Sequence, residues 1–105
     1  MNTTLNIAKD FSRSPAGRFE TDGPFSGEAF REKLLRPALA TSERVEVDLN
    51  GALGFGSSFL EEAFGGLVRK CGLTAAELHR RLTIKSNLRT YVERVWRYVD
   101  EAKPI

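Results

Sequence analysis

The sequence has few of the residues that carry redox and metal chemistry. Its 105 residues include one cysteine, Cys71, and one histidine, His79. A single cysteine cannot form an internal disulfide, and two such residues do not make a metal-ligand cluster. We therefore expect no metal and no cofactor, and we assign Cys71 to the core.

Long apolar stretches are also missing. No run approaches the roughly 18 apolar residues of a membrane-spanning helix, and the N-terminal "MNTTLNIAKDF" is not a charged-then-apolar signal peptide. These absences predict a cytoplasmic protein that contacts no membrane. A chain of 105 residues can bury one core but not two, so residues 1–105 are predicted to form one domain.

The first third of the chain predicts a hairpin followed by a helix. Leu5 and Ile7 indicate a strand, and "SRSPAG" supplies a turn into a second short strand around residues 18–21. Ser26 is typical of a helix cap. The helix that it begins is predicted to end or kink at Pro37.

The rest of the chain alternates strands and helices. The clearest strand is "RVEVDL", in which Val45, Val47 and Leu49 face one way. An apolar stripe from Leu60 to Cys71 at helical spacing predicts the next helix, which ends at Gly72. A helical turn (75–80), a strand (82–86) and a final helix (87–102) follow.

This order predicts an α/β fold with a mixed, roughly four-stranded sheet and helices mainly on one face. Parallel crossovers bring the loops after successive strands to one edge of the sheet, where α/β proteins usually place their sites. Those loops are "DGPFSG", "GALGFGSS" and "KSN". Their polar candidates for contact with a partner are Asp22, Ser26, Lys85, Ser86 and Asn87.

The stretch "GALGFGSSFLEE" is the most distinctive of these loops. Ser58 and Glu61 match the capping-box pattern, which predicts that Ser58 caps the helix. Ser57 precedes that cap and has no such role, in a loop where Gly54 and Gly56 permit close approach by another molecule. Ser57 is therefore the better candidate for modification, the alternative being that both serines only begin the helix.

Two glycines inside the same predicted helix suggest close packing. Gly65 and Gly66 each cost about 1 kcal/mol relative to alanine in a helix. Either a neighbouring helix of the same domain or a bound partner could lie against them. The partner-binding candidates on this helix and its loop are Gly54, Phe55, Gly56, Ser58, Glu61, Glu62, Gly65 and Gly66.

The sequence does not favour an enzyme. "GFGSSF" departs from the G-x-S-x-G nucleophile elbow, the glycine-rich loop lacks the lysine of a phosphate-binding loop, and His79 lies in a charged helical turn. One alternative is a small nucleotide- or anion-binding domain that uses the same loops, with Lys85 or Arg18 as the anion contact.

A second alternative is a nucleic-acid adaptor. Basic residues enrich the C-terminal third, among them Arg89, Arg94 and Arg97, but acidic residues share the final helix. The whole chain has 16 basic and 14 acidic residues, a net charge of +2. That balance favours a solvated face over a nucleic-acid-binding face.

Two motifs resemble a known family. "DGPFSGEAFREKLL" and "GSSFLEEAFGGLVR" resemble the bacterial STAS-like family of unknown function, which is related to the STAS domains of anti-sigma factor antagonists. In those antagonists a serine at the start of the second helix is phosphorylated by a histidine-kinase-like ATPase that also acts as the anti-sigma factor. Alignment of the serine pairs places Ser57 at the phosphoacceptor position, with Gly56 where aspartate is usual.

The resemblance implies a regulatory protein–protein interaction module that is not an enzyme. Its partner would bind the second helix and the adjoining loops, and phosphorylation of Ser57, or less favourably Ser58, would switch that binding. The implied partner is an ATPase-type kinase or anti-sigma factor.

Overall fold

Three parallel strands form the sheet of this protein, which we describe from a computed structural model covering residues 1–104. They are β1 (Asn2–Asn6), β2 (Arg44–Asp48) and β3 (Leu82–Lys85), in the order β1-β2-β3. In their register Thr4 lies beside Glu46, which in turn lies beside Thr83. The predicted α/β class is confirmed, but the sheet has three strands, all parallel, instead of about four in a mixed arrangement.

The predicted hairpin is wrong because the second strand does not form. After β1 the chain turns directly into the short helix α1 (Ile7–Asp10), which Asn6 caps by accepting from the amide of Lys9. Residues 18–21 lead into the 3₁₀ turn η1 (Glu20–Asp22) instead of a strand. The Asp22 carboxylate accepts from the amides of Arg18 and Phe19, which removes two donors that a ladder would need.

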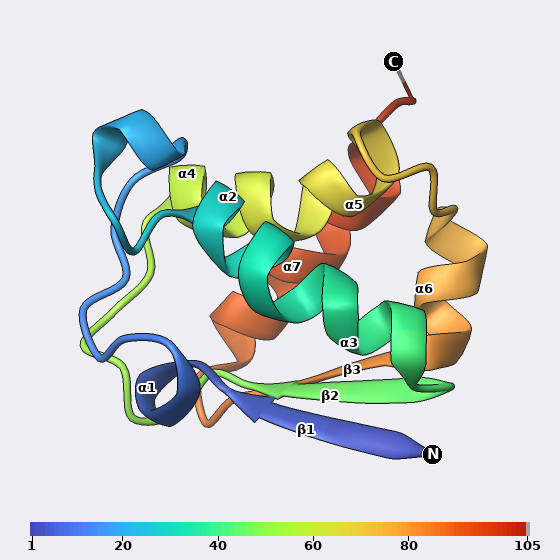
Figure 1. The fold of residues 1–105 in the computed structure, drawn as a ribbon, viewed down its shortest axis with the longest axis horizontal. Helices are drawn as coiled ribbons and strands as arrows, with labels where there is room; N and C mark the ends of the chain where they lie inside the picture. The colour runs from blue at the N-terminus through green and yellow to red at the C-terminus, as the bar shows by residue number, and fades with distance from the viewer. Residues whose placement is uncertain (105) are drawn as a thin grey trace.

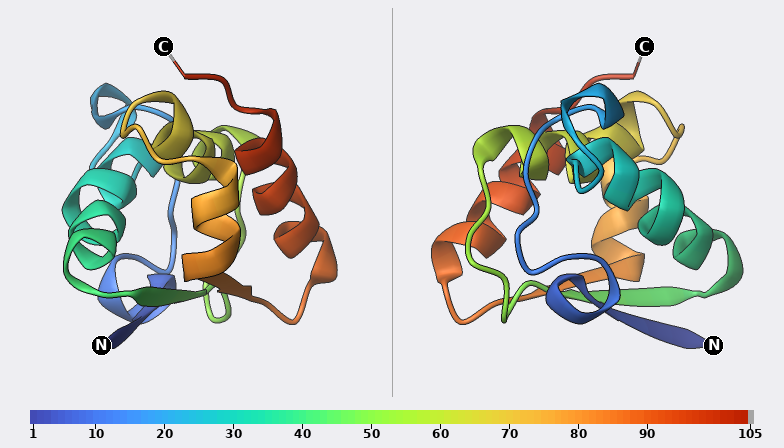
Figure 2. Two further views of the ribbon diagram at one scale, coloured as in Figure 1. Left: turned by 90° about the vertical axis from the view of Figure 1, so that its right-hand side faces the viewer. Right: turned by 60° about the vertical axis from the view of Figure 1, so that its left-hand side comes forward.

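Helices cover one face of the sheet (Figures 1 and 2). The first long helix consists of α2 (Gly27–Phe30), a π-helical stretch η2 (Arg31–Leu35) and α3 (Arg36–Thr41). The second consists of α4 (Ser57–Leu60), a π-helical stretch η3 (Glu61–Gly65) and α5 (Gly66–Arg69). The helices α6 (Ala75–Arg81) and α7 (Arg89–Glu101) complete the layer.

The helix starts and stops follow local chemistry. Ser26 caps α2 by accepting from the amide of Ala29, as predicted, and Thr74 caps α6 in the same way. Gly72 adopts a φ of +75° just after the second long helix, a conformation that favours glycine. Pro37 does not end its helix, because it lies in the first turn of α3, directly after the π-helical stretch.

The core lies between the sheet and the helices. Val45 and Val47 of β2 and Ile84 of β3 point into it, and the stripe residues Leu60 and Phe64 meet them from the second long helix. The alternate strand positions, such as Thr4 and Thr83, are exposed on the other face. That face is polar, which is unusual for a parallel sheet.

Candidate functional site

The loops at the carboxyl edge of the sheet form one continuous surface. Because the strands are parallel, the loop after β2 (residues 49–56) and the loop after β3 (residues 86–88) leave the sheet on the same side (Figure 1). The amide of Asn87 donates to Oδ1 of Asn50 at 2.8 Å, which joins the two loops. The hydroxyl of Tyr91, in the first turn of α7, accepts from the amide of Phe55 at 3.4 Å.

A third segment lies along the first of these loops. Residues 12–17 run from the sheet towards α4 beside residues 50–56 (Figure 2, right). The amide of Leu53 donates to the carbonyl of Arg13 at 2.8 Å. The carboxyl edge is therefore built from three chain segments, which are joined by hydrogen bonds from backbone amides to a carbonyl and to two side chains.

Ser57 and Ser58 are exposed at the start of the second long helix, on this edge. The prediction that Ser58 caps the helix is wrong: Gly56 is the N-cap residue, and no side chain caps this end. Glu61 does not complete a capping box because Arg18 and Arg69 hold its carboxylate. Ser57 is thus the first helical residue, and neither serine hydroxyl donates or accepts a protein hydrogen bond within residues 1–104.

Several of the other predicted loop residues pack or form hydrogen bonds within the domain. Phe55 is buried and packs edge-on against Tyr91 with ring centroids 5.2 Å apart. Ser26 is fully buried as the cap of α2, and Asp22 closes its own turn. Phe55 and Ser26 are therefore not available to a partner, whereas Asp22, Gly56, Lys85 and Asn87 are exposed.

Glu62, predicted to be part of a partner surface, is buried in an ionic cluster. Its side chain is 2% exposed, and Arg31, also 2% exposed, donates to its carboxylate at 2.7 Å and to its backbone carbonyl at 2.6 Å. Lys70 lies 3.2 Å from the same carboxylate. We call this set the ionic cluster; its members are Arg18, Arg31, Glu61, Glu62, Arg69 and Lys70.

The cluster holds both of its glutamates ionised. Burial raises the pKa of the Glu62 carboxyl, but hydrogen bonds and charge from Arg31 and Lys70 outweigh this, so its pKa lies below the ordinary value. Burial also raises the pKa of the Glu61 carboxyl, but hydrogen bonds and charge from Arg69 and Arg18 outweigh it, so this pKa is lowered too. Arg18 is committed to Glu61 at 2.5 Å, which leaves it unsuited to the anion contact that we considered for it.

Gly65 and Gly66 pack against parts of the same domain. A Cβ on Gly66 would collide with the guanidinium of Arg31, and one on Gly65 would meet Oε2 of Glu61 at 2.7 Å and the carbonyl of Tyr98 at 3.3 Å. Both glycines are buried. Of the two explanations for this pair, the structure supports close packing within the domain.

Sequence reasoning missed two residues of the carboxyl edge. The side chain of Leu53 is 77% exposed and that of Leu88 is 59% exposed. The apolar spacing of the final helix includes Leu88, but this residue is the N-cap of α7 and lies outside the buried stripe. The sequence signal for an exposed leucine is the position of Leu53 inside the glycine-rich "GALGFG", because such a loop has few side chains that could bury it.

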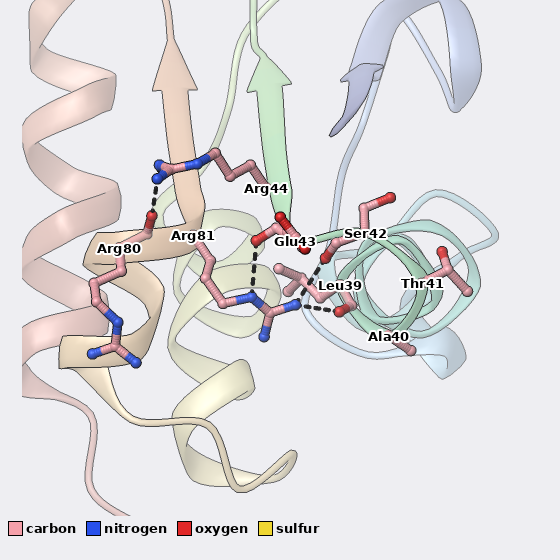
Figure 3. Close-up of a pocket in the computed structure, with 8 residues that line it drawn as sticks. All are labelled: Leu39, Ala40, Thr41, Ser42, Glu43, Arg44, Arg80 and Arg81. Carbon is pink, nitrogen blue, oxygen red and sulfur yellow. Dashed lines mark hydrogen bonds between the residues drawn. The ribbon is translucent and has the colours of Figure 1, made fainter. Parts of the chain in front are cut away.

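A hollow of the surface lies at the opposite edge of the sheet. It has a volume of about 520 Å³ and is lined by residues 39–44 together with Arg80 and Arg81 (Figure 3). Arg81 donates to the carbonyls of Leu39, Ser42 and Glu43, and Arg44 donates to the carbonyl of Arg80. These arginines tie the end of α3 to the end of α6, and no predicted site residue lines this hollow.

The single histidine of the sequence is engaged with residues of α7. His79 lies in α6, where it stacks on Trp96 and its Nε2 is 2.7 Å from the Asp100 carboxylate. Among residues 1–104, no three His, Cys, Asp or Glu side chains are placed to hold a metal ion. In the same residues, no helix is both long and apolar enough to cross a membrane.

These features define a small α/β domain with one helical layer and an exposed loop surface at its carboxyl edge. A sequence model of the family described as STAS-like domain of unknown function (DUF4325) matches residues 26–89, more than half of the chain. The chain belongs to this STAS-like family, as its two motifs suggested. Comparison with curated proteins and with solved structures gave no match.

Proposed function

We propose that this domain is a non-enzymatic regulatory module that binds a protein partner through its carboxyl edge, and that phosphorylation of Ser57 switches this binding. The observation that carries the proposal is the position of Ser57: exposed, without a hydrogen bond from its hydroxyl in the described residues, and first in a 13-residue helical segment. A kinase could reach this hydroxyl without unfolding the domain.

A phosphate on Ser57 would suit its local environment. The first amides of a helix have no intrahelical acceptor, and the helix dipole favours negative charge at this end. The modified serine would therefore add up to two negative charges to the surface without distorting the helix start. A partner that binds the unmodified edge would meet an altered charge.

The resemblance to anti-sigma factor antagonists supports the choice of partner. In those proteins the kinase is a histidine-kinase-like ATPase that is also the regulated partner, and we propose a partner of this class here. The absence of a histidine beside Ser57, within residues 1–104, favours a serine that is modified over one that attacks a substrate.

The test is affinity capture from the native cell with the wild-type chain and with Ser57→Ala and Ser57→Asp. Ser58→Asp is the matched control, because Ser58 is also exposed and is the next residue of the helix. We expect phosphate on Ser57 of the wild type and capture of an ATPase-type kinase that Ser57→Asp loses and Ser58→Asp retains. Identical partners for all four proteins, with no phosphate, would contradict the proposal.

A further inference from the structure

The two exposed leucines of the carboxyl edge belong to two loops that contact each other. Leu53 precedes Gly54, whose Cβ position is 3.6 Å from the hydroxyl of Tyr91, and Leu88 lies one helical turn before Tyr91. The contact between Asn50 and Asn87 joins the same two loops nearer the sheet. Leu53 and Leu88 therefore flank one junction between the loops, and both side chains face solvent.

The backbone around these leucines is already ordered. Leu53 donates to Arg13, and the carbonyl of Leu88 accepts from the amide of Tyr91 at 3.1 Å. The hydroxyl of Ser86 accepts from the amide of Leu88 at 3.1 Å, which fixes the loop from its other side. Binding at a preorganised surface loses less conformational entropy than binding at a mobile one.

Three basic and two acidic residues lie on or beside the chain segments that carry the leucines. Arg13, Lys85 and Arg89 are exposed, and within residues 1–104 none of the three makes an ion pair. The two nearby carboxylates each bind a backbone amide of the edge: Asp10 accepts from Asn6 at 2.7 Å and Asp48 accepts from Asn50 at 2.9 Å. We call Arg13, Leu53, Lys85, Leu88 and Arg89 the leucine edge.

We propose that the leucine edge binds an acidic protein segment that carries leucine-sized apolar side chains. This inference rests on the proposed function and adds the chemistry of the partner. Apolar side chains of the segment would cover Leu53 and Leu88, and its carboxylates would pair with Arg13, Lys85 and Arg89. Exposed large apolar side chains match the apolar residues of such a segment, and the unpaired cations match its carboxylates.

A peptide fits this surface better than nucleic acid or lipid. Two exposed leucines offer nothing to a phosphate backbone, which basic side chains alone would bind. Stable binding to an anionic membrane takes a larger apolar insertion or a denser basic cluster than these five residues provide. We therefore assign the leucine edge to the binding of a protein segment.

The experiment selects ligands from random peptides, so that the chemistry of the surface alone decides which are retained. A random 12-residue peptide library displayed on phage is panned on the wild-type chain and depleted on Leu53→Ser/Leu88→Ser. The most enriched peptides are synthesised and their dissociation constants measured by fluorescence anisotropy. The charge variant is Arg13→Glu/Arg89→Glu, and its matched control is Lys33→Glu/Arg80→Glu, the same charge change at exposed residues away from this edge.

The expected result is a set of peptides with net negative charge and two or more apolar residues. Their binding should weaken about 10-fold or more in the leucine variant and in Arg13→Glu/Arg89→Glu, and change less than about 3-fold in the control. Higher salt should also weaken binding. Circular dichroism of each variant checks that it remains folded.

Several results would overturn the inference. They are enrichment of neutral or basic peptides, no enrichment, or equal binding by the wild type and the leucine variant. Sedimentation of the wild type with phosphatidylserine vesicles, or concentration-dependent dimerisation, that the leucine variant abolishes would assign the surface to lipid or to a second copy. Such results would leave the Ser57 switch intact, because that proposal is tested by phosphate and kinase capture from the cell.

Discussion

Two adjacent glutamates, Glu61 and Glu62, have different environments in this protein. Glu61 is half-buried at the margin of the ionic cluster, whereas Glu62 is buried inside it against Arg31. A buried carboxylate is tolerated only when ion pairs and hydrogen bonds replace the water that it loses. Glu62 therefore contributes to the stability of the domain, and it is not available to a partner.

The lowered pKa values of Glu61 and Glu62 predict how stability depends on pH. A carboxyl whose pKa is lower in the folded than in the unfolded state stabilises the fold above its unfolded pKa, and this stabilisation disappears as the pH falls through the folded pKa. We expect the free energy of unfolding to decrease as the pH is lowered below about 4.5, the ordinary pKa of glutamate. Urea unfolding between pH 7 and pH 3 measures it.

Two variants assign the effect. Glu62→Gln should be less stable than the wild type at pH 7 and should lose less stability on acidification. Glu93→Gln, at an exposed residue of α7, should follow the wild-type curve. An equal pH dependence for Glu62→Gln and the wild type would show that the ionic cluster does not set the acid sensitivity.

The two long helices pack closely against each other where each departs from regular α-helical geometry. Both contain a π-helical stretch, and each stretch begins at a member of the ionic cluster, Arg31 in one helix and Glu61 in the other. The guanidinium of Arg31 crosses from the first helix to the carbonyl of Glu62 and lies where a side chain on Gly66 would be. The glycine provides the space that the arginine occupies.

This fit predicts a specific cost for Gly66→Ala. Alanine is the better helix former by about 1 kcal/mol, but its Cβ would displace a buried guanidinium, and such overpacking costs about 1 to 3 kcal/mol. We expect a net loss of about 1 kcal/mol in the free energy of unfolding by urea denaturation. Gly54→Ala, whose Cβ would make only an ordinary contact, should change it by less than about 0.5 kcal/mol. An increase in stability for Gly66→Ala would show that Arg31 can move aside.

At the scale of the whole molecule, the sheet has one covered face and one open face. All of the long helices lie on one side (Figure 1). The inward residues of β2, Val45 and Val47, are buried, while Glu46 and Asp48 on the other side remain half-exposed. The core therefore depends on one face of each strand.

This asymmetry predicts unequal costs for substitutions on the two faces. Val47→Ala removes two methyl groups from a fully buried site and should lower the free energy of unfolding by about 2 kcal/mol. Thr83→Val, on the open face of β3, should change it by less than about 0.5 kcal/mol. Thermal and urea unfolding of both variants measure the difference. A loss above about 1 kcal/mol in the free energy of unfolding for Thr83→Val would show that polar side chains on the open face stabilise the domain.

Periodicity in the sequence predicted most elements but not the N-terminal segment. The strand at 44–49 and the helix after Ser57 have strict alternation or a continuous stripe, so their positions follow from the hydrophobic pattern. Residues 18–21 have no such pattern, and a nearby side chain, that of Asp22, binds the free amides of that segment. The location of the candidate site was predicted from the parallel crossovers, but the availability of its side chains was not.

The α/β class, the edge on which the loops after β2 and β3 gather and the membership in the STAS-like family follow from the amino-acid sequence alone, because hydrophobic periodicity and motifs are local properties of the chain. The burial of Glu62 and the space that Gly66 leaves for Arg31 became visible in the folded domain. The folded domain also showed that Ser57 begins its helix without a side-chain cap and that Leu53 and Leu88 remain exposed. Each of these depends on which distant residue occupies the neighbouring space, and the chain order does not specify that neighbour.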